Sequence, residues 1–191
     1  MDTWVLPALL GLGLAAASGF RTFLPMLMLS AAVHFELFGV TLNDSFSWVG
    51  STPALITLSI AAVIELAADL IPYVDNVLSI VGNVTGPIAG AIAAGSVFAD
   101  LDPSTAAIAG VIVGAPTALA FSTAQTGTRA ASTATTGGLG NPVLSVIEDV
   151  IAFCTALIAL VLPVLIPILL ALLIYVLYRV VRKFRRSRQP A

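Results

Sequence analysis

Long apolar runs, interrupted by only a few polar residues, follow one another along the whole chain. These runs lie at about 4–31, 54–71, 76–98, 104–125 and 147–180. Each reaches or approaches the roughly 20 apolar residues with which an α-helix crosses a bilayer. The pattern predicts an all-α fold, a polytopic transmembrane helix bundle of about five spans, within a range of four to six.

Prolines predict where these helices bend. Pro25, in the stretch SGFRTFLP, predicts a kink or break near Arg21 in the first run. The last run contains Pro163 and Pro167 and is longer than one perpendicular span needs. It is either one tilted, kinked helix or a hairpin of two spans. A hairpin would place the apolar stretch LVLPVLIP at the water interface, which favours the single helix.

The stretch STAQTGTRAASTATTGGLGN, at 122–141, is the most polar part of the chain and holds one charge, Arg129. Exposed to lipid, its backbone and hydroxyl groups would be unsatisfied. Two interpretations stay open: a loop exposed to water, or a segment that folds back between the helices and lines a polar cavity.

Three glycines recur at a spacing of four in the third run: Gly82, Gly86 and Gly90. Small residues on one helix face let backbones approach closely where lipid offers no hydrophobic drive to associate. The spacing therefore predicts tight helix packing. Pro87, which lies among these glycines, also suggests a local break that could free backbone carbonyls for a substrate.

The composition is that of an integral membrane protein. Only 9% of the residues are charged, against about 25% in soluble domains, and the mean hydropathy is +1.06. Nearly the whole chain must therefore contact lipid or other spans, which leaves no room for a separate soluble domain. We expect one transmembrane domain at 1–182, followed by a basic tail at 183–191.

The positive charge gathers at the end of the chain. Six of the eight basic residues belong to this cluster: Arg179, Arg182, Lys183, Arg185, Arg186 and Arg188. The positive-inside rule then places the C-terminus in the cytoplasm, and five spans place the N-terminus outside. The cluster also offers contacts to anionic lipid head groups, although a topology anchor is the simpler interpretation.

Charged residues also occur within the apolar runs, where an unpaired arginine costs from about 3 to more than 10 kcal/mol. Such an arginine should face the bundle interior and be paired. We expect Arg21 to pair with Glu65 or Asp69, which share a helix face. For Arg129 we expect Glu148 or Asp149. One interpretation is that these pairs only fix the helix register. The other is that one of them forms a titratable gate or an anion site. Asp75 is counted among the carboxylates of such a gate.

Two short motifs occur twice in the same order. TGTRA at 126–130 is similar to SGFRT at 18–22, and NPVLSVI at 141–147 is similar to DNVLSIV at 75–81. Many transporters contain internal repeats with the substrate between the halves. The motif spacings differ between the two copies, so the sequence predicts at most a degenerate repeat.

The runs IELAADLIPYVDNVLSIVGNVTGPIAGAI and RAASTATTGGLGNPVLSVIEDV carry a family resemblance. The chain resembles, over roughly 5–175, the bacterial membrane-protein family catalogued as domain of unknown function 4126. The resemblance implies a polytopic protein of the bacterial inner membrane and brings no settled activity. It covers five acidic positions but not Arg21, where the family pattern often lacks the arginine. These five positions are Glu65, Asp69, Asp75, Glu148 and Asp149.

No enzyme is expected, because the chain lacks HExxH, GxSxG, a P-loop and a Cys/His metal set. Neither a cofactor nor a metal is implied, and nucleic acid is not an expected partner. The leading hypothesis is a transporter or channel for a small anionic or polar solute, with the acidic residues as a proton-linked gate. The residues expected to contact the substrate are Arg21, Arg129, Thr126, Thr128, Ser132 and Thr133. The alternative is a structural or assembly protein that packs against lipid, a partner or its own copies through its glycine-rich helices.

Overall fold

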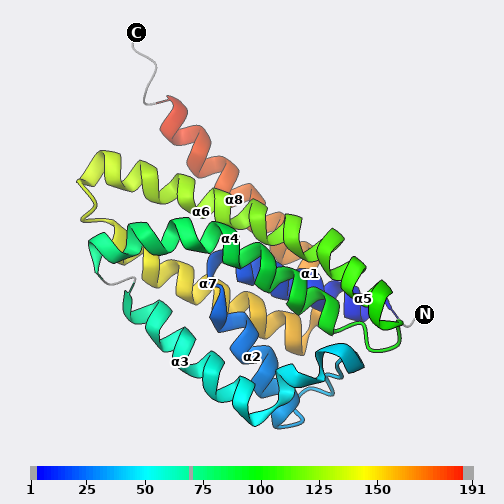
Figure 1. Ribbon diagram of the computed structural model, residues 1–191. Coiled ribbons are helices and arrows are strands. Elements are labelled where there is room, and N and C mark those ends of the chain that lie inside the picture. Colours follow the sequence, from blue (N-terminus) through cyan, green and yellow to red (C-terminus); the bar gives the residue numbers. More distant parts are fainter. Residues whose placement is uncertain (1–3, 69–70, 187–191) are drawn as a thin grey trace.

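The computed structural model describes residues 4–68 and 71–186, and in this part the chain is helical and contains no strand (Figure 1). The first half holds α1 (Val5–Phe20), α2 (Phe23–His34), the 3₁₀ helix η1 (Asp44–Gly50), α3 (Thr52–Ala68) and α4 (Pro72–Ser96). The second half holds α5 (Pro103–Ala109), the π-helical η2 (Gly110–Gly114), α6 (Ala115–Thr136), α7 (Asn141–Val161), η3 (Pro163–Leu165) and α8 (Ile166–Arg186). The predicted all-α class is confirmed for these residues.

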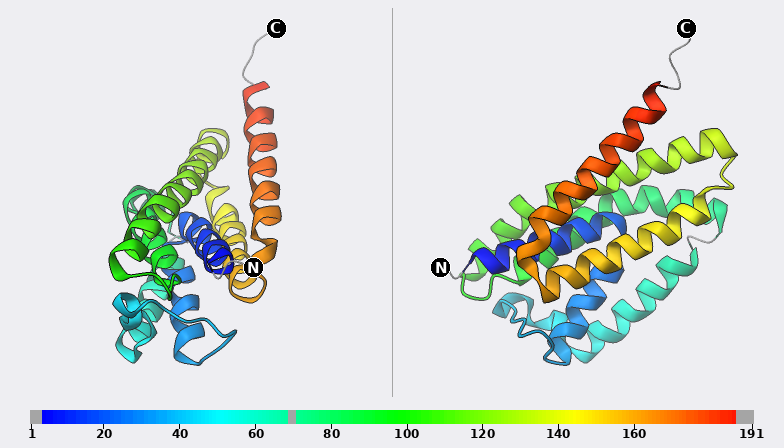
Figure 2. Two further views of the ribbon diagram at one scale, coloured as in Figure 1. Left: turned by 90° about the vertical axis from the view of Figure 1, so that its right-hand side faces the viewer. Right: turned by 180° about the vertical axis from the view of Figure 1, so that it is seen from behind.

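The helix α1 forms the centre of the bundle. It is buried continuously from Gly13 to Phe20 and packs against α4, α6 and α7. The left view of Figure 2 looks along the bundle and shows α1, in deep blue, surrounded by the other helices. Its small residues, such as Ala15, Ala16 and Ala17, allow three neighbours to approach one helix closely.

The first apolar run is broken at Arg21 and Thr22, as the sequence predicted. Arg21 has an extended backbone conformation and ends α1, and Pro25 lies in the first turn of α2, where a missing N–H is tolerated. In Figure 1, α2 turns back towards the end of the bundle from which α1 enters. The predicted single span at 4–31 is therefore wrong, because the run forms two short helices whose junction lies inside the bundle.

Fewer helices than predicted meet the requirements for a membrane span by length and composition. Among the described residues, two do so: Pro103–Thr136, which joins α5, η2 and α6, and α7. A third is gained if η1 and α3, which meet at 61°, count as one bent span. The chain thus has helices able to cross a membrane, while the five-span arrangement stays a prediction.

The polar stretch at 122–141 is helical over most of its length, which corrects the interpretation as a loop. It is not a re-entrant segment, but its Gln125 and Arg129 line a pocket, as the second interpretation predicted. It continues α6 to Thr136 and then turns through Gly137 into α7. Its hydroxyl groups donate to carbonyls one turn earlier, as Thr126 does to Ser122 O at 2.9 Å and Thr136 to Ser132 O at 2.8 Å. These bonds satisfy the polar side chains within the helix.

The last apolar run forms two helices, so the favoured single helix is wrong. Leu162 leaves the helical conformation, because the following Pro163 disfavours it and cannot donate a backbone hydrogen bond. The right view of Figure 2 shows α8 folding back from α7 at this point. Helix α8 continues to Arg186, so the first part of the predicted basic tail is helical; residues 187–191 lie outside the described part.

Close glycine contacts join α4 to its neighbours at two of the three predicted positions, Gly86 and Gly90. A Cβ at Gly90 would lie 2.7 Å from Ala118 Cβ, and one at Gly114 would meet Gly90 O. A Cβ at Gly86 would lie 3.0 Å from Ser18 O. No described atom lies within 4 Å of a Cβ at Gly82, so this glycine has no packing role there. The helix also runs through Pro87 without the suggested break.

Candidate functional site

A pocket of about 340 Å³ lies where α1 ends and α2 begins. Segments from the α1–α2 junction, α3, α4 and α6 form its walls. The polar or glycine residues of this wall that matter below are Ser18, Arg21, Glu65, Gly82, Gln125 and Arg129. A mainly apolar pocket with a few charged and polar side chains in its wall thus lies at the junction that ends the central helix.

Glu65 of α3 caps the N-terminus of α2. Its Oε1 accepts a hydrogen bond from the Thr22 N–H at 2.8 Å, and its Oε2 accepts one from the Phe23 N–H at 3.0 Å. The first N–H groups of a helix lack partners within the helix, and the helix dipole favours negative charge there. Glu65, which belongs to another helix, therefore stabilises the start of α2 by accepting hydrogen bonds from N–H groups that have no partner within α2.

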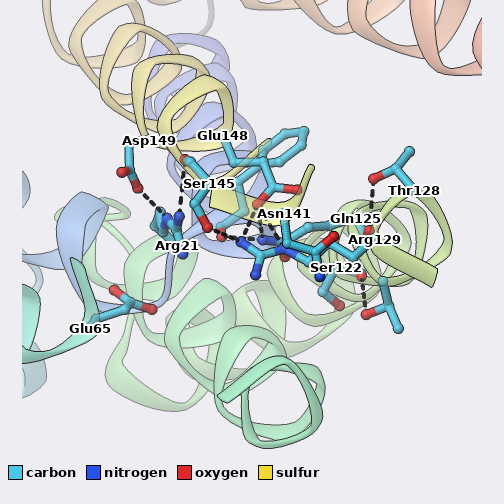
Figure 3. Close-up of polar contacts among 12 residues, drawn as sticks. Arg21, Glu65, Ser122, Gln125, Thr128, Arg129, Asn141, Ser145, Glu148 and Asp149 are labelled. Atoms are coloured by element: carbon cyan, nitrogen blue, oxygen red, sulfur yellow. Dashed lines mark hydrogen bonds and ion pairs between the residues drawn. The ribbon is translucent and has the colours of Figure 1, made fainter. Parts of the chain in front are cut away.

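Arg21, at the other side of the same junction, is 3% exposed and reaches α7. Its Nε forms an ion pair with Asp149, and its NH2 group donates to Ser145 O at 3.1 Å (Figure 3). The sequence had paired Arg21 with Glu65 or Asp69, and Arg129 with Glu148 or Asp149. Within the described residues Arg21 pairs with Asp149 instead of Glu65, whose carboxylate accepts backbone N–H groups. Asp69 lies outside the described residues.

Arg129 of α6 forms the predicted ion pair with Glu148. Its Nε donates to Glu148 Oε2 at 3.0 Å, and its NH2 group contacts the same oxygen. The two side chains are 5% and 6% exposed. The NH2 group also donates to Ser145 Oγ at 2.9 Å. Burial of both partners makes this a strongly constrained pair, since removing either one would leave a desolvated charge.

Gln125 connects this pair to the end of α1. Its Nε2 donates to Glu148 Oε2 at 2.8 Å and to Phe20 O at 3.1 Å. The last carbonyls of a helix lack partners within that helix, so Gln125 satisfies one of them. Both helix ends at the junction are therefore bonded by side chains from other helices, Glu65 on one side and Gln125 on the other.

Helix α7 brings both arginines together. Ser145, Glu148 and Asp149 lie within one turn, so their side chains project from neighbouring positions of the helix surface. Through its carbonyl and hydroxyl oxygens, Ser145 contacts both arginines. Figure 3 shows Arg21 and Arg129 approaching this turn from different helices.

A comparison with known families identifies the family of the chain. A family model, described as a domain of unknown function, DUF4126, matches residues 8–183. The chain belongs to this family. No curated protein and no solved structure matched it. The matched range of the DUF4126 family contains the α1–α2 junction and all residues of the network around it.

The sequence did not single out three residues of this site: Thr22, Gln125 and Ser145. The signal for Gln125 is its position four residues before Arg129, which places both on one helix face. This spacing indicates a shared face only if the stretch is helical, and neither of the two interpretations left open for it was a continuous helix. Ser145 similarly lies three residues before Glu148 on α7. Thr22 contributes its backbone N–H, which carries no signal in the sequence.

Four residues predicted to contact the substrate do not line the pocket: Thr126, Thr128, Ser132 and Thr133. The Thr128 hydroxyl donates to Gln125 O at 2.7 Å, and that of Thr133 accepts from Asn141 Nδ2 at 3.1 Å. Asp69 lies outside the described residues, and Asp75 is on α4 at a position whose side chain is not described. Gly82 lines the pocket wall, where its missing side chain leaves space.

The charges around the pocket are nearly balanced. Among the described residues, two arginines face three carboxylates, those of Glu65, Glu148 and Asp149. Arg129 and Glu148 are deeply buried, whereas the Asp149 side chain is 28% exposed. The pocket thus brings charged side chains of both signs close to the junction.

Proposed function

We propose that this protein is a membrane transporter or channel for a small anionic or polar solute, and that the solute binds in the pocket at the α1–α2 junction. The observation that carries this proposal is the break in the central helix. Two helix ends, a buried arginine and a carboxylate meet there around a pocket of about 340 Å³. This volume lies at the lower end of the range of ligand pockets, which suits a small molecule.

The physics of the bilayer supports this assignment. Irregular backbone at membrane depth is tolerated only where it is buried in protein or lines a cavity that holds water. Transporters use discontinuous helices whose N-termini point at anionic groups of the substrate. The junction of α1 and α2 has both features, since Thr22 and Phe23 present N–H groups beside the pocket.

The gate in this proposal is formed by the arginine–carboxylate pairs. Asp149 and Glu148 are neighbours on α7, so a movement of α7 changes the contacts of Arg21 and Arg129 together. A proton on a carboxylate would weaken its ion pair. Uptake and release of protons are therefore coupled to the helix arrangement around the pocket.

We place the protein in the bacterial inner membrane with its C-terminus in the cytoplasm. The basic end of α8 supports this orientation and would lie against anionic lipid head groups. In this proposal, α3, α4, the helix of α5 to α6, α7 and α8 each cross the membrane. The pair α1 and α2 enters from one side and returns to it, as their directions in Figure 1 suggest, so the N-terminus lies outside.

The alternative of a structural or assembly protein receives less support. It relied on glycine-rich helix faces that meet a partner or another copy. Gly90 and Gly114 instead contact each other's helices inside the chain, and Gly86 contacts α1. The glycine contacts at Gly86, Gly90 and Gly114 are therefore used within the chain, and among the predicted glycines only Gly82 has no described contact.

A flux assay in vesicles of purified protein tests the proposed function. The probes are lactate, phosphate and chloride as anions and glycerol as a neutral polar solute, with a pH-sensitive dye inside the vesicles. We expect at least one probe to cross faster than in vesicles without protein. The double variant Arg21→Met/Asp149→Asn, which leaves neither partner of the pair charged, should lose this flux.

The matched control is Arg182→Met/Asp44→Asn, which removes the same kinds of side chain at exposed positions away from the pocket. It should retain the flux of the unmodified protein. Transport would be rejected if no probe crossed faster than in empty vesicles, or if both double variants behaved alike.

A further inference from the structure

Ser18 is a buried polar residue of the pocket wall without a partner. It is 1% exposed, and among the described residues its hydroxyl oxygen has no hydrogen-bond partner. A buried hydroxyl without a hydrogen bond destabilises a folded protein, because the group loses its bonds to water and gains none in return. The other polar groups of the junction are bonded, as shown above for Thr22, Phe23 and Glu65. Ser18 is therefore a group of the pocket wall whose hydroxyl, within the described part of the chain, is open to a further hydrogen bond.

The hydrogen bonds of Glu65 indicate which class of ligand the pocket can bind. Its two carboxylate oxygens each accept one N–H at the start of α2, an arrangement that any carboxylate of similar reach could reproduce. Glu65 itself lines the pocket, next to Ser18 and Arg21. The chain thus holds its own carboxylate at the place where an anionic ligand would be most strongly attracted.

We infer that the pocket takes a small carboxylate together with one proton. The proton converts the Glu65 carboxylate to the neutral acid, which releases the N–H groups of Thr22 and Phe23. The carboxylate of the ligand then accepts these two hydrogen bonds, and Ser18 donates to the ligand. This inference rests on the proposed function, for which it names the substrate class and the coupling ion.

Charge balance gives the reason for the proton. The described part of the site already holds one carboxylate more than it holds arginines. A further anion would raise this excess in surroundings where charge is poorly screened. One proton on Glu65 compensates the entering charge, so the net charge of the site is the same before and after binding.

The groups that face Glu65 are consistent with this exchange. The charged side chains nearest the pocket on the other elements are Arg21 at the junction, Arg129 on α6, and Glu148 and Asp149 on α7. His34 of α2 and Asp44 of η1 lie at the opposite end of α3, near Gly50. Asp69 and the side chain of Asp75 are outside the described part. Arg21 keeps the pocket attractive for an anion while Glu65 is neutral.

Calorimetric titration of the purified protein in lipid nanodiscs with sodium lactate tests this inference. Between pH 5.5 and 8, lactate stays ionised, and its affinity should rise by about tenfold for each unit by which the pH falls, because one proton is taken up with each anion. Repeating the titration in buffers of different ionisation enthalpy counts this proton directly. Neutral lactamide should bind much more weakly.

Three variants sharpen the test. Glu65→Gln imitates the neutral acid, so it should bind lactate tightly and without dependence on pH. Ser18→Ala should bind more weakly than the unmodified protein but take up the same proton. Glu36→Gln makes the same change as Glu65→Gln at an exposed position and should behave like the unmodified protein.

The inference is overturned if lactate does not bind, if it binds no better than lactamide, or if binding takes up no proton. The proton count needs no variant, so it decides even if Glu65→Gln fails to fold. Flux in vesicles together with binding that is independent of pH would overturn this inference and leave the proposed function standing. Proton-linked lactate binding without flux would overturn the proposed function and leave this inference standing.

Discussion

At the residue scale, Arg21 and Arg129 reach one turn of α7 from two different helices. The cost of an unpaired charge in lipid predicted that both would be paired, and it predicted the Arg129–Glu148 pair. It did not predict the partner of Arg21. Glu65 and Asp149 were equally suitable carboxylates, and only the fold decides that Asp149 lies beside the guanidinium while Glu65 lies beside the N–H groups of α2.

The buried Arg129–Glu148 pair allows a direct test at this scale. Arg129→Met should destabilise the protein by roughly 3–5 kcal/mol, because it leaves the Glu148 carboxylate buried without this cation. The double variant Arg129→Met/Glu148→Gln should recover most of the loss. Unfolding in detergent, followed by circular dichroism against denaturant, measures both.

Arg182→Met, at an exposed position of α8, is the matched control and should change the stability by about 0.5 kcal/mol or less. Equal stabilities of the single and the double variant at the Arg129–Glu148 pair would contradict the importance given to this pair.

At the element scale, the helix from Pro103 to Thr136 shows why composition alone did not predict that the polar stretch from 122 onwards is helical. Its last part is rich in Ser, Thr and Gly, which are typical of loops, but it contains no Pro and no Asp between 122 and 140. Hydroxyl groups that bond to carbonyls one turn earlier make such a helix acceptable. Sequence spacing could have revealed it only through the shared face of Gln125 and Arg129.

Two glycines of this same helix should respond differently to alanine. Gly114→Ala places a methyl group against Gly90 O of α4 and should cost roughly 1–3 kcal/mol through displaced helices. Gly127→Ala meets no described atom within 4 Å and should be neutral or stabilise by up to about 1 kcal/mol.

Thermal unfolding in detergent compares these two variants with the unmodified protein. If Gly114→Ala were as stable as Gly127→Ala, the close contact between α4 and η2 would not be present in the protein.

At the scale of the whole molecule, apolar runs predicted the helical class and the break near Arg21, but they did not predict the path of the chain. Hydropathy shows how long a run is and does not show whether the chain crosses or turns back. The run at 4–31 was therefore predicted as one span with a break near Arg21, and the run at 147–180 as one kinked helix in preference to a hairpin, whereas each forms two helices. In both cases a proline lies next to the break, and its exact effect depends on the neighbouring helices.

The two pairs of similar motifs, 75–81 with 141–147 and 18–22 with 126–130, differ in where they lie in the fold. The motifs at 75–81 and 141–147 both occur at the start of helices, α4 and α7, which pack against α1. The other two do not correspond, since Arg21 lies at a helix break and Arg129 lies within α6. The degenerate internal repeat stays a prediction.

The central claim is that solutes in water reach a pocket at the α1–α2 junction inside a membrane-embedded bundle. The most direct measurement is the reaction rate of a cysteine at Gly82, where the wall has space, with a charged thiol reagent that does not cross lipid. The background is Cys154→Ala, which removes the native thiol. Val84→Cys is the control, since Val84 lies two residues away on α4 and is 64% exposed on the apolar surface.

We predict that Gly82→Cys reacts from one side of the membrane, while Val84→Cys, which faces lipid, reacts very slowly from either side. The probe that shows flux should slow the reaction at Gly82 by occupying the pocket. Equally slow reaction of both cysteines would contradict the claim, because the junction would then be sealed from water and its charges would serve only to hold the helices together.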